Sequence, residues 1–304
     1  MDLSDLRSQI YTGKDKRLSR GSGRRPPWLR VKLPGGGRFR EVNRVLEECG
    51  LHTVCRSAKC PNLGSCWARK AVTFMILGYI CTRSCRFCAV TSGRPSPPDP
   101  DEPSRIAEAV GRLSLRYVVI TSVTRDDLDD GGASIFARTV RAIREAVPRC
   151  RVELLIPDFR GSERALMEVL ESRPDVVGHN IETVRRLYPR VRPGADYKRS
   201  LDIIGEIAKS GIVSKSGFMV GLGESTEEAI ELMRELRDAG CALLTIGQYL
   251  QPLRTSLPVE RYYAPEEFKS LEDAGYELGF SGIASGPLVR SSYRAEELAH
   301  NILP

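Results

Sequence analysis

Three cysteines stand close together in the sequence. Cys81, Cys85 and Cys88 are separated by three and then two residues, directly after the first predicted strand. A structural zinc site takes four ligands, commonly as two pairs of cysteine or histidine, and only His52 is near, without finger spacing. Three thiolates suit a [4Fe–4S] cluster with one iron left open. An open iron can chelate a small molecule that carries an amine and a carboxylate.

A second group of three cysteines precedes the first. Cys55, Cys60 and Cys66 are separated by four and five residues. Taken alone, this spacing fits a zinc or structural role equally well. Because it stands just ahead of the other motif, we interpret it as three ligands of a second, auxiliary cluster. The remaining cysteines are scattered, and we predict that they are ordinary small core or surface residues: Cys49, Cys150 and Cys241.

The composition is that of a soluble globular protein. The chain has 304 residues, 41% of them hydrophobic and 28% charged, which are ordinary fractions for such proteins. No stretch approaches the roughly 18 uncharged apolar residues that span a bilayer. Because Asp2 and Asp5 occur in a start that lacks an apolar core, the chain does not begin like a secretory signal. We therefore predict a cytoplasmic protein that binds no membrane.

The net charge of +7 is unevenly placed along the chain. Residues 1–40 contain eleven Lys and Arg against three Asp, a local excess of +8, so the remaining 264 residues sum to about −1. A nucleic-acid-binding protein should carry its basic excess on the folded domain, so we predict no nucleic-acid partner. Two interpretations of the basic arm stay open: a solvated tail, and a segment that docks or steers an acidic partner.

The elements that must position these cysteines follow a repeated pattern. Residues 1–40 are rich in Gly, Pro and Arg and predict an extended arm, a short helix is predicted at about Glu41–Cys49, and the first cysteine group lies in loop-like sequence. Apolar, β-branched runs then alternate with amphipathic stretches. The predicted strands are Val72–Leu77, Tyr117–Ser122, Arg151–Ile156, Asp175–Asn180, Ile212–Val220 and Ala242–Tyr249. The predicted helices are Ser104–Leu113, Ser134–Val147, Ser162–Ser172, Ser200–Ser210, Ser225–Ala239 and Pro265–Leu278.

Several of these helices begin with Ser, a plausible N-cap, and Ser225 with Glu228 predicts a capping box. Six strand–helix units with apolar strands indicate a parallel sheet. Six units are too few for a closed eight-stranded barrel, and an open doubly wound sheet is the alternative. Polar residues, however, follow several strands, as at the rim of a barrel active site. We therefore predict an α/β fold, a partial (β/α)6 TIM-type barrel with N-terminal and C-terminal extensions.

The two cysteine motifs in this order resemble lipoyl synthases, a family of the radical S-adenosylmethionine (SAM) superfamily. The similarity extends from about Leu51 to Arg294 and includes Thr124–Leu128, Val152–Asp158, His179–Thr183, Lys215-Ser216, Gln248–Pro252 and Arg290–Tyr293. It implies three parts: residues 1–70, a basic arm with the auxiliary-cluster segment; residues 71–280, the radical SAM partial barrel; and residues 281–304, a C-terminal segment with an Arg-Ser-Ser-Tyr motif.

The resemblance implies a sulfurtransferase that inserts two sulfur atoms, at C6 and C8, into a protein-bound octanoyl-lysine. An alkyl C–H has no acidity, so a cofactor must supply a radical. The implied cofactors are two [4Fe–4S] clusters and SAM. Cys81, Cys85 and Cys88 would hold the cluster that cleaves SAM. The auxiliary cluster would donate the sulfur, and its implied ligands are Cys55, Cys60, Cys66 and Ser292, with Ser291 as the alternative to Ser292.

The resemblance also suggests residues that contact SAM. Thr121 and Ser122 end the second strand, where the superfamily binds the methionyl amine. The ribose and the methionyl carboxylate would be bound by Asn180, Glu182 and Arg192. The segment Gly217–Glu224 would flank the adenine, with Gly221 and Glu224 in contact; a bend in a buried strand is nearly as good an interpretation of its glycines. Asp126 and Asp127 are site groups or part of a helix-initiating loop, and we favour the loop.

The implied partners are octanoylated lipoyl-carrier domains, found in 2-oxoacid dehydrogenase acyltransferase subunits and the glycine-cleavage carrier protein. A reduced ferredoxin- or flavodoxin-type protein would donate electrons. Two alternative functions remain. A biotin synthase shares the radical motif but lacks the N-terminal cysteine group, and a non-enzymatic metal-binding module does not explain the repeated strand–helix units.

Overall fold

A seven-stranded parallel sheet forms the centre of the molecule. The computed structural model describes residues 25–31, 34–300 and 302–303. Neighbouring strands of the sheet are all parallel, and β1 and β9 are its two edges, so the barrel is open between them. In sheet order, the strands are β1 (Thr73–Ile76), β4 (Tyr117–Ser122), β5 (Arg151–Leu155), β6 (Val176–Gly178), β7 (Val213–Val220), β8 (Leu243–Gln248) and β9 (Gly282–Gly286). The predicted partial barrel is confirmed.

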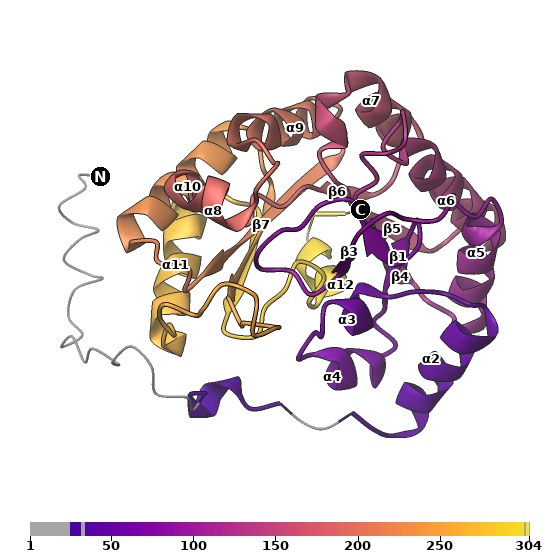
Figure 1. Ribbon diagram of the computed structural model, residues 1–304, viewed down its shortest axis with the longest axis horizontal. Coiled ribbons are helices and arrows are strands. Elements are labelled where there is room, and N and C mark those ends of the chain that lie inside the picture. Colours follow the sequence, from indigo (N-terminus) through magenta and orange to yellow (C-terminus); the bar gives the residue numbers. More distant parts are fainter. Residues whose placement is uncertain (1–24, 32–33, 301, 304) are drawn as a thin grey trace.

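Six helices between successive strands cover the outside of the barrel (Figure 1). They correspond to the six predicted helices: α5 (Glu102–Arg112), α6 (Ala133–Ala146), α7 (Glu163–Glu171), α9 (Tyr197–Lys209), α10 (Thr226–Asp238) and α11 (Pro265–Glu277). Ser162 caps α7, and Ser225 forms the predicted capping box of α10. None of the helices in the described part of the chain is long and apolar enough to cross a membrane.

Three of the predicted serine caps are wrong, because an earlier residue occupies the N-cap. The N-caps of α5, α6 and α9 are Asp101, Gly132 and Asp196. At α9, the Asp196 carboxylate accepts a hydrogen bond from the backbone N–H of Arg199 at 2.7 Å. Ser200 therefore lies inside the helix, where it is fully buried.

The seventh strand, β9, was not predicted from the sequence. Its five residues, Gly-Ile-Ala-Ser-Gly, include two glycines and lack the β-branched run that marks the other strands. Small residues are needed here: a Cβ on Gly282 would stand 2.8 Å from Leu243 Cδ2. β9 pairs with β8, so the sheet continues into residues 281–304. The predicted division at residues 70 and 280 stays a prediction.

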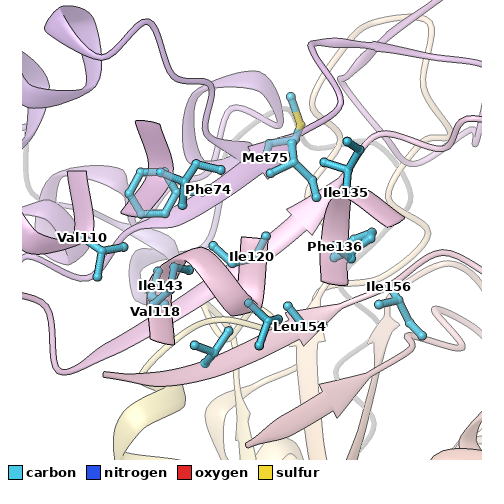
Figure 2. Packing of buried hydrophobic residues seen from close by; sticks show 14 of the residues in the cluster. Phe74, Met75, Val110, Val118, Ile120, Ile135, Phe136, Ile143, Leu154 and Ile156 are labelled. Carbon is cyan, nitrogen blue, oxygen red and sulfur yellow. The ribbon is translucent and has the colours of Figure 1, made fainter. Parts of the chain in front are cut away.

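The main core lies between the sheet and its outer helices. Along β4, Val118 and Ile120 are fully buried in the same cluster as Phe136 and Ile143 of α6 (Figure 2). Burial of one such side chain contributes roughly 1.5–3 kcal/mol. Because successive strand residues point to opposite faces, Tyr117, which alternates with Val118, is on the opposite, inner face.

The N-terminal elements pack beside the open edge of the barrel. They are η1 (Pro27–Leu29), α2 (Gly37–Glu48), α3 (Val54–Ser57) and α4 (Leu63–Trp67). Cys55 and Cys66 of the first cysteine group therefore lie on the short helices α3 and α4, whereas Cys60 lies in the predicted loop between them. The Thr53 side chain caps α3. α2 begins four residues before the predicted helix. Most of the predicted extended arm lies outside the described residues.

Short elements complete the chain. A parallel pair, β2 (Ile80–Cys81) and β3 (Thr91–Ser92), encloses the second cysteine group. The segment after β6 contains η3 (Arg185–Leu187) and α8 (Tyr188–Val191), and η2 (Phe159–Gly161) follows β5. α12 (Ala295–Ala299) lies near the middle of the barrel in Figure 1. Its Ala299 joins Val176 and Leu243 in a small buried cluster.

Candidate cluster and cofactor site

The second cysteine group lies in a loop that backbone hydrogen bonds hold in place. Cys81 Sγ accepts hydrogen bonds from the backbone N–H groups of Arg83 at 3.4 Å and Thr124 at 3.3 Å. Cys88 Sγ accepts one from Val90 N–H at 3.4 Å. The Val90 donor favours the thiolate of Cys88 over its thiol, and a thiolate is the form that binds a metal.

The three thiols also affect one another electrostatically. Burial, together with the neighbouring Cys85, Cys81 and Glu182, raises the pKa of Cys88 to about 11. Burial also raises the pKa of Cys85, which Arg192 partly opposes. The three predicted ligands are therefore close together. With a pKa of about 11 the Cys88 thiol is protonated at neutral pH, and coordination to iron would deprotonate it.

The first cysteine group surrounds a cavity of about 310 Å³. Cys55, Cys60 and Cys66 line it together with Arg290 and Ser292. Burial, together with the neighbouring Cys60 and Cys66 thiols, raises the pKa of Cys55 to about 11. The structure thus brings these three cysteines, from α3, the turn after it and α4, to one cavity.

The donors around this space fit a cluster better than a single ion. Within the described residues, no three His, Cys, Asp or Glu side chains gather closely enough to hold one metal ion. In a [4Fe–4S] cluster the cysteines bind separate irons, so their sulfurs surround the group instead of converging on a point. A cavity with three thiols and a hydroxyl on its wall meets that requirement.

The two serines of the Arg-Ser-Ser-Tyr motif face different groups. Ser292 lines the cavity with the cysteines, whereas the Ser291 hydroxyl accepts a hydrogen bond from Asn180 Nδ2. Asn62, between two of the cysteines, donates from Nδ2 to the Leu288 carbonyl at 2.6 Å. That bond ties the first cysteine segment to the C-terminal segment that carries both serines.

Arg290 connects the two groups. Its guanidinium lies on the cavity wall, and burial lowers its pKa, whereas the opposite charges of Cys60 and Glu182 raise it. One buried cation thus interacts with a ligand candidate of the first group and with a residue beside the second. The segment of Arg290 and Ser291 thus lies between the first cysteine group and the pair of Asn180 and Glu182.

Three predicted SAM contacts lie together beside the second cysteine group. Asn180 Nδ2 donates to Glu182 Oε1 at 3.1 Å, and Arg192 Nη1 donates to the Asn180 carbonyl at 2.8 Å. Burial raises the pKa of Glu182, and the nearby Arg192 lowers it. Glu182 has a φ of 70°, a left-handed conformation that costs energy for a residue other than glycine. Strain of this kind is common at binding sites.

The remaining predicted contacts differ in their hydrogen bonds. Thr121 Oγ1 donates to the Leu155 carbonyl at 2.9 Å, within the sheet. Ser122 Oγ is buried and has no hydrogen-bond partner among the described residues. Of these two residues, Ser122 therefore has the hydroxyl available to a ligand.

Gly221 and Glu224 form one tight turn after β7. The Glu224 carboxylate accepts hydrogen bonds from the backbone N–H groups of Gly221 at 2.6 Å and Leu222 at 2.9 Å. Gly221 has a φ of +99°, and a Cβ there would stand 2.5 Å from the Arg261 carbonyl oxygen. The turn requires glycine at this position, which agrees with the bend interpretation. The adenine contact stays a prediction.

The sequence interpretation missed a buried charge network behind the second cysteine group. Arg83, between Cys81 and Cys85, donates to Asp126 at 2.6 Å and to Asp158 at 2.7 Å; the Arg83 side chain is 8% exposed and that of Asp158 is 0% exposed. Asp126, which we assigned to a helix-initiating loop, therefore anchors the cysteine loop. The arginine within the motif was the available signal, but its partners are 43 and 75 residues away.

Replacing Asp158 by alanine should destabilise the protein by about 3–5 kcal/mol, because it leaves the buried Arg83 charge without one of its two partners. Denaturant unfolding would measure the change, and an iron count would show whether the second cysteine group still loads. The matched control is Asp202→Ala, which removes the exposed Lys198–Asp202 pair and should cost less than about 0.5 kcal/mol. Equal losses in the two variants would contradict the anchoring role.

Comparisons with known proteins identify the family of this chain. Residues 75–236 match the profile of the Radical SAM superfamily, and residues 2–60 match that of the N-terminal domain of lipoyl synthase of the Radical SAM family. The chain is 55% identical to a lipoyl synthase of Rubrobacter xylanophilus, across 92% of this chain and 88% of the relative. It is 54% identical to one of Caldanaerobacter subterraneus, across 90% and 96%.

Solved structures of distant proteins share the fold. Methylornithine synthase superposes with a TM-score of 0.55 at 14% identity, covering 80% of this chain and 74% of that chain. The [FeFe]-hydrogenase maturase HydG superposes with a TM-score of 0.56 at 13% identity, covering 69% and 50%. These likenesses concern the fold alone, whereas the relatives above half identity identify the family. This chain belongs to the lipoyl synthase family of the radical SAM superfamily.

Proposed function

We propose that this enzyme inserts two sulfur atoms, at C6 and C8, into an octanoyl-lysine on a carrier protein, giving lipoyl-lysine. The observation that carries the proposal is that the chain has, besides Cys81, Cys85 and Cys88, a separate group of three cysteines that lines one cavity together with Ser292. The relatives named lipoyl synthase at 54–55% identity support it. A single cluster would account for SAM cleavage but would leave the sulfur without a source.

Each group of ligands has a separate task in this proposal. Cys81, Cys85 and Cys88 hold a [4Fe–4S] cluster that, when bound, supplies the electron that cleaves SAM and yields a 5′-deoxyadenosyl radical. Cys55, Cys60, Cys66 and Ser292 hold the auxiliary cluster that supplies the sulfur. Iron–sulfur clusters prefer thiolate ligands, so a serine oxygen is the ligand that is released most easily.

Side chains of this chain bind and orient SAM. The Arg192 guanidinium pairs with the methionyl carboxylate, because a guanidinium presents several N–H donors in a fixed plane. Asn180 and Glu182 hydrogen-bond the ribose hydroxyls, and the unpartnered Ser122 hydroxyl is the better candidate for the methionyl amine, with Thr121 behind it. The turn of Gly221 and Glu224 flanks the adenine.

The substrate is an octanoylated lipoyl-carrier domain, of a 2-oxoacid dehydrogenase acyltransferase subunit or a glycine-cleavage carrier protein. A reduced ferredoxin- or flavodoxin-type donor supplies electrons. The basic arm is a docking segment for an acidic carrier or a solvated tail, and both interpretations stay open because residues 1–24 lie outside the described residues.

The test is anaerobic reconstitution with iron and sulfide, followed by reaction with an octanoylated carrier, reductant and SAM. We expect about eight irons per chain, four for each of two clusters, and a carrier that gains two sulfur atoms by mass spectrometry. One bound zinc, or about four irons with no sulfur transferred, would contradict the proposal.

A further inference from the structure

A continuous row of hydrogen bonds connects the end of β5 to Arg192. It begins at the Ile156 carbonyl after β5 and passes to His179 Nδ1 at 2.9 Å. His179 Nε2 lies 2.9 Å from Ser200 Oγ of α9, and Ser200 Oγ lies 2.6 Å from Tyr188 Oη of α8. Arg192 Nη1 donates to Tyr188 Oη at 2.7 Å. Every bond in the row is buried.

The two ends of the row determine where each hydrogen lies. A guanidinium only donates and a carbonyl only accepts. Tyr188 therefore accepts from Arg192 and donates to Ser200, and Ser200 donates to His179 Nε2. His179 is then a neutral imidazole with its hydrogen on Nδ1. Burial agrees with this state, because it lowers the pKa of His179 to about 4.

A charged His179 would break this order. Nε2 would then donate to Ser200, which would donate to Tyr188 Oη, and the phenol hydrogen would have no acceptor in the row. An unpaired buried donor is costly. The row therefore has a single arrangement of its hydrogens. In that arrangement, Tyr188 Oη accepts the hydrogen bond from the Arg192 guanidinium.

The guanidinium at the end of the row is held by several contacts, but one of its N–H donors has no hydrogen-bond partner among the described residues. Arg192 also donates to the Asn180 carbonyl at 2.8 Å and lies over the Tyr188 ring, with Cζ 5.3 Å from its centroid. Its side chain is 9% exposed, and Nε is buried with no partner among the described residues. The charge acts on Cys85 and Glu182, lowering the pKa of each. The free donor is thus available beside the second cysteine group.

We infer that His179, Ser200 and Tyr188 are positioning residues that fix the Arg192 guanidinium for the carboxylate of SAM. This inference rests on the proposed function. The three side chains come from different loops and helices, so together they hold Arg192 relative to the barrel. The cysteine loop is docked at the same place, because Arg86 N–H donates to the Val191 carbonyl at 3.0 Å. A donor held in advance loses little freedom when the ligand binds.

The experiment measures binding without turnover, by equilibrium dialysis of labelled SAM against the unreduced, cluster-loaded enzyme. Tyr188→Phe removes the acceptor of Arg192 and keeps the ring. We expect the dissociation constant for SAM to rise about tenfold, as for one lost hydrogen bond to a charged group, with the iron content unchanged. Ser200→Ala interrupts the row further away and should produce a smaller rise.

Three comparisons separate positioning from general loosening of the structure. Tyr197→Phe is the matched control, because its ring packs edge-on to Tyr188 at 5.2 Å while its hydroxyl donates to Glu235, outside the row; it should bind SAM as the parent does. Decarboxylated SAM, which lacks only the carboxylate, should bind Tyr188→Phe and the parent equally. Combining Tyr188→Phe with Arg192→Lys should weaken SAM binding no further than Arg192→Lys alone.

The outcomes distinguish this inference from the function on which it rests. If the loaded parent does not bind SAM, the proposed function fails. Two results would contradict the positioning role in a parent that binds SAM. In the first, Tyr188→Phe and Ser200→Ala bind SAM as tightly as the parent does. In the second, these variants bind decarboxylated SAM more weakly than the parent by the same factor as SAM.

Discussion

Replacing Cys85 by alanine should abolish the formation of 5′-deoxyadenosine, whereas replacing Cys60 should leave that cleavage partly intact and abolish sulfur transfer. The structure gives each thiol different surroundings. Cys85 interacts with Cys81, Glu182 and Arg192, whereas Cys60 interacts with Arg290 and raises the pKa values of Cys55 and Cys66. Loss of one cluster therefore need not remove the other.

Two assays on the reconstituted variants test this separation. Chromatography measures 5′-deoxyadenosine, and mass spectrometry of the carrier measures sulfur transfer. Cys150→Ala is a matched control, because this buried cysteine belongs to neither group and should retain both activities. Lipoyl product from the Cys60 variant would show that the first group does not supply the sulfur.

The fold was largely predictable because its elements depend on local pattern. β4 is a short, mostly apolar run, and both β4 and β5 are followed by an amphipathic helix. The strand that the pattern missed, β9, contains glycine and alanine because its neighbours leave little room. Packing against other segments of the chain, such as Leu243 beside Gly282, determines these small residues and leaves no periodic pattern in the strand itself.

In the candidate site, too, the residues that a local sequence pattern marks were predictable and the others were not. The cysteine groups were identifiable because cluster ligands are close in sequence and chemically unusual. The Arg83–Asp158 pair and the His179–Ser200–Tyr188 row were not, because their members come from separate strand–helix units and each residue alone has an ordinary structural explanation. Ser200 illustrates the difficulty, because its position suggested a helix N-cap. In the fold, Ser200 is an interior residue of α9, and its hydroxyl hydrogen-bonds to His179 in the row.

Replacing Ser292 by alanine should leave both clusters assembled but abolish lipoyl product. Three thiolates can hold a four-iron cluster with one iron open, so the iron content should stay at about eight per chain. The product should be lost because Ser292, on the wall of the cavity with Cys55, Cys60 and Cys66, is the ligand whose release would free the sulfur. Equal activity in the Ser292 variant and the parent would refute this role.

The neighbouring serine provides the matched control, and the structure predicts a different defect for it. Ser291 accepts from Asn180, a candidate ribose ligand, so Ser291→Ala should be milder and should raise the KM for SAM while sulfur transfer continues at saturation. The same atom change at two adjacent positions would then affect two different steps. Because both serines lie on one segment, which Asn62 ties to the first cysteine group, a general loosening of that segment would impair both variants in the same way. A loss of product confined to Ser292→Ala therefore requires that the Ser292 oxygen itself acts at the auxiliary cluster.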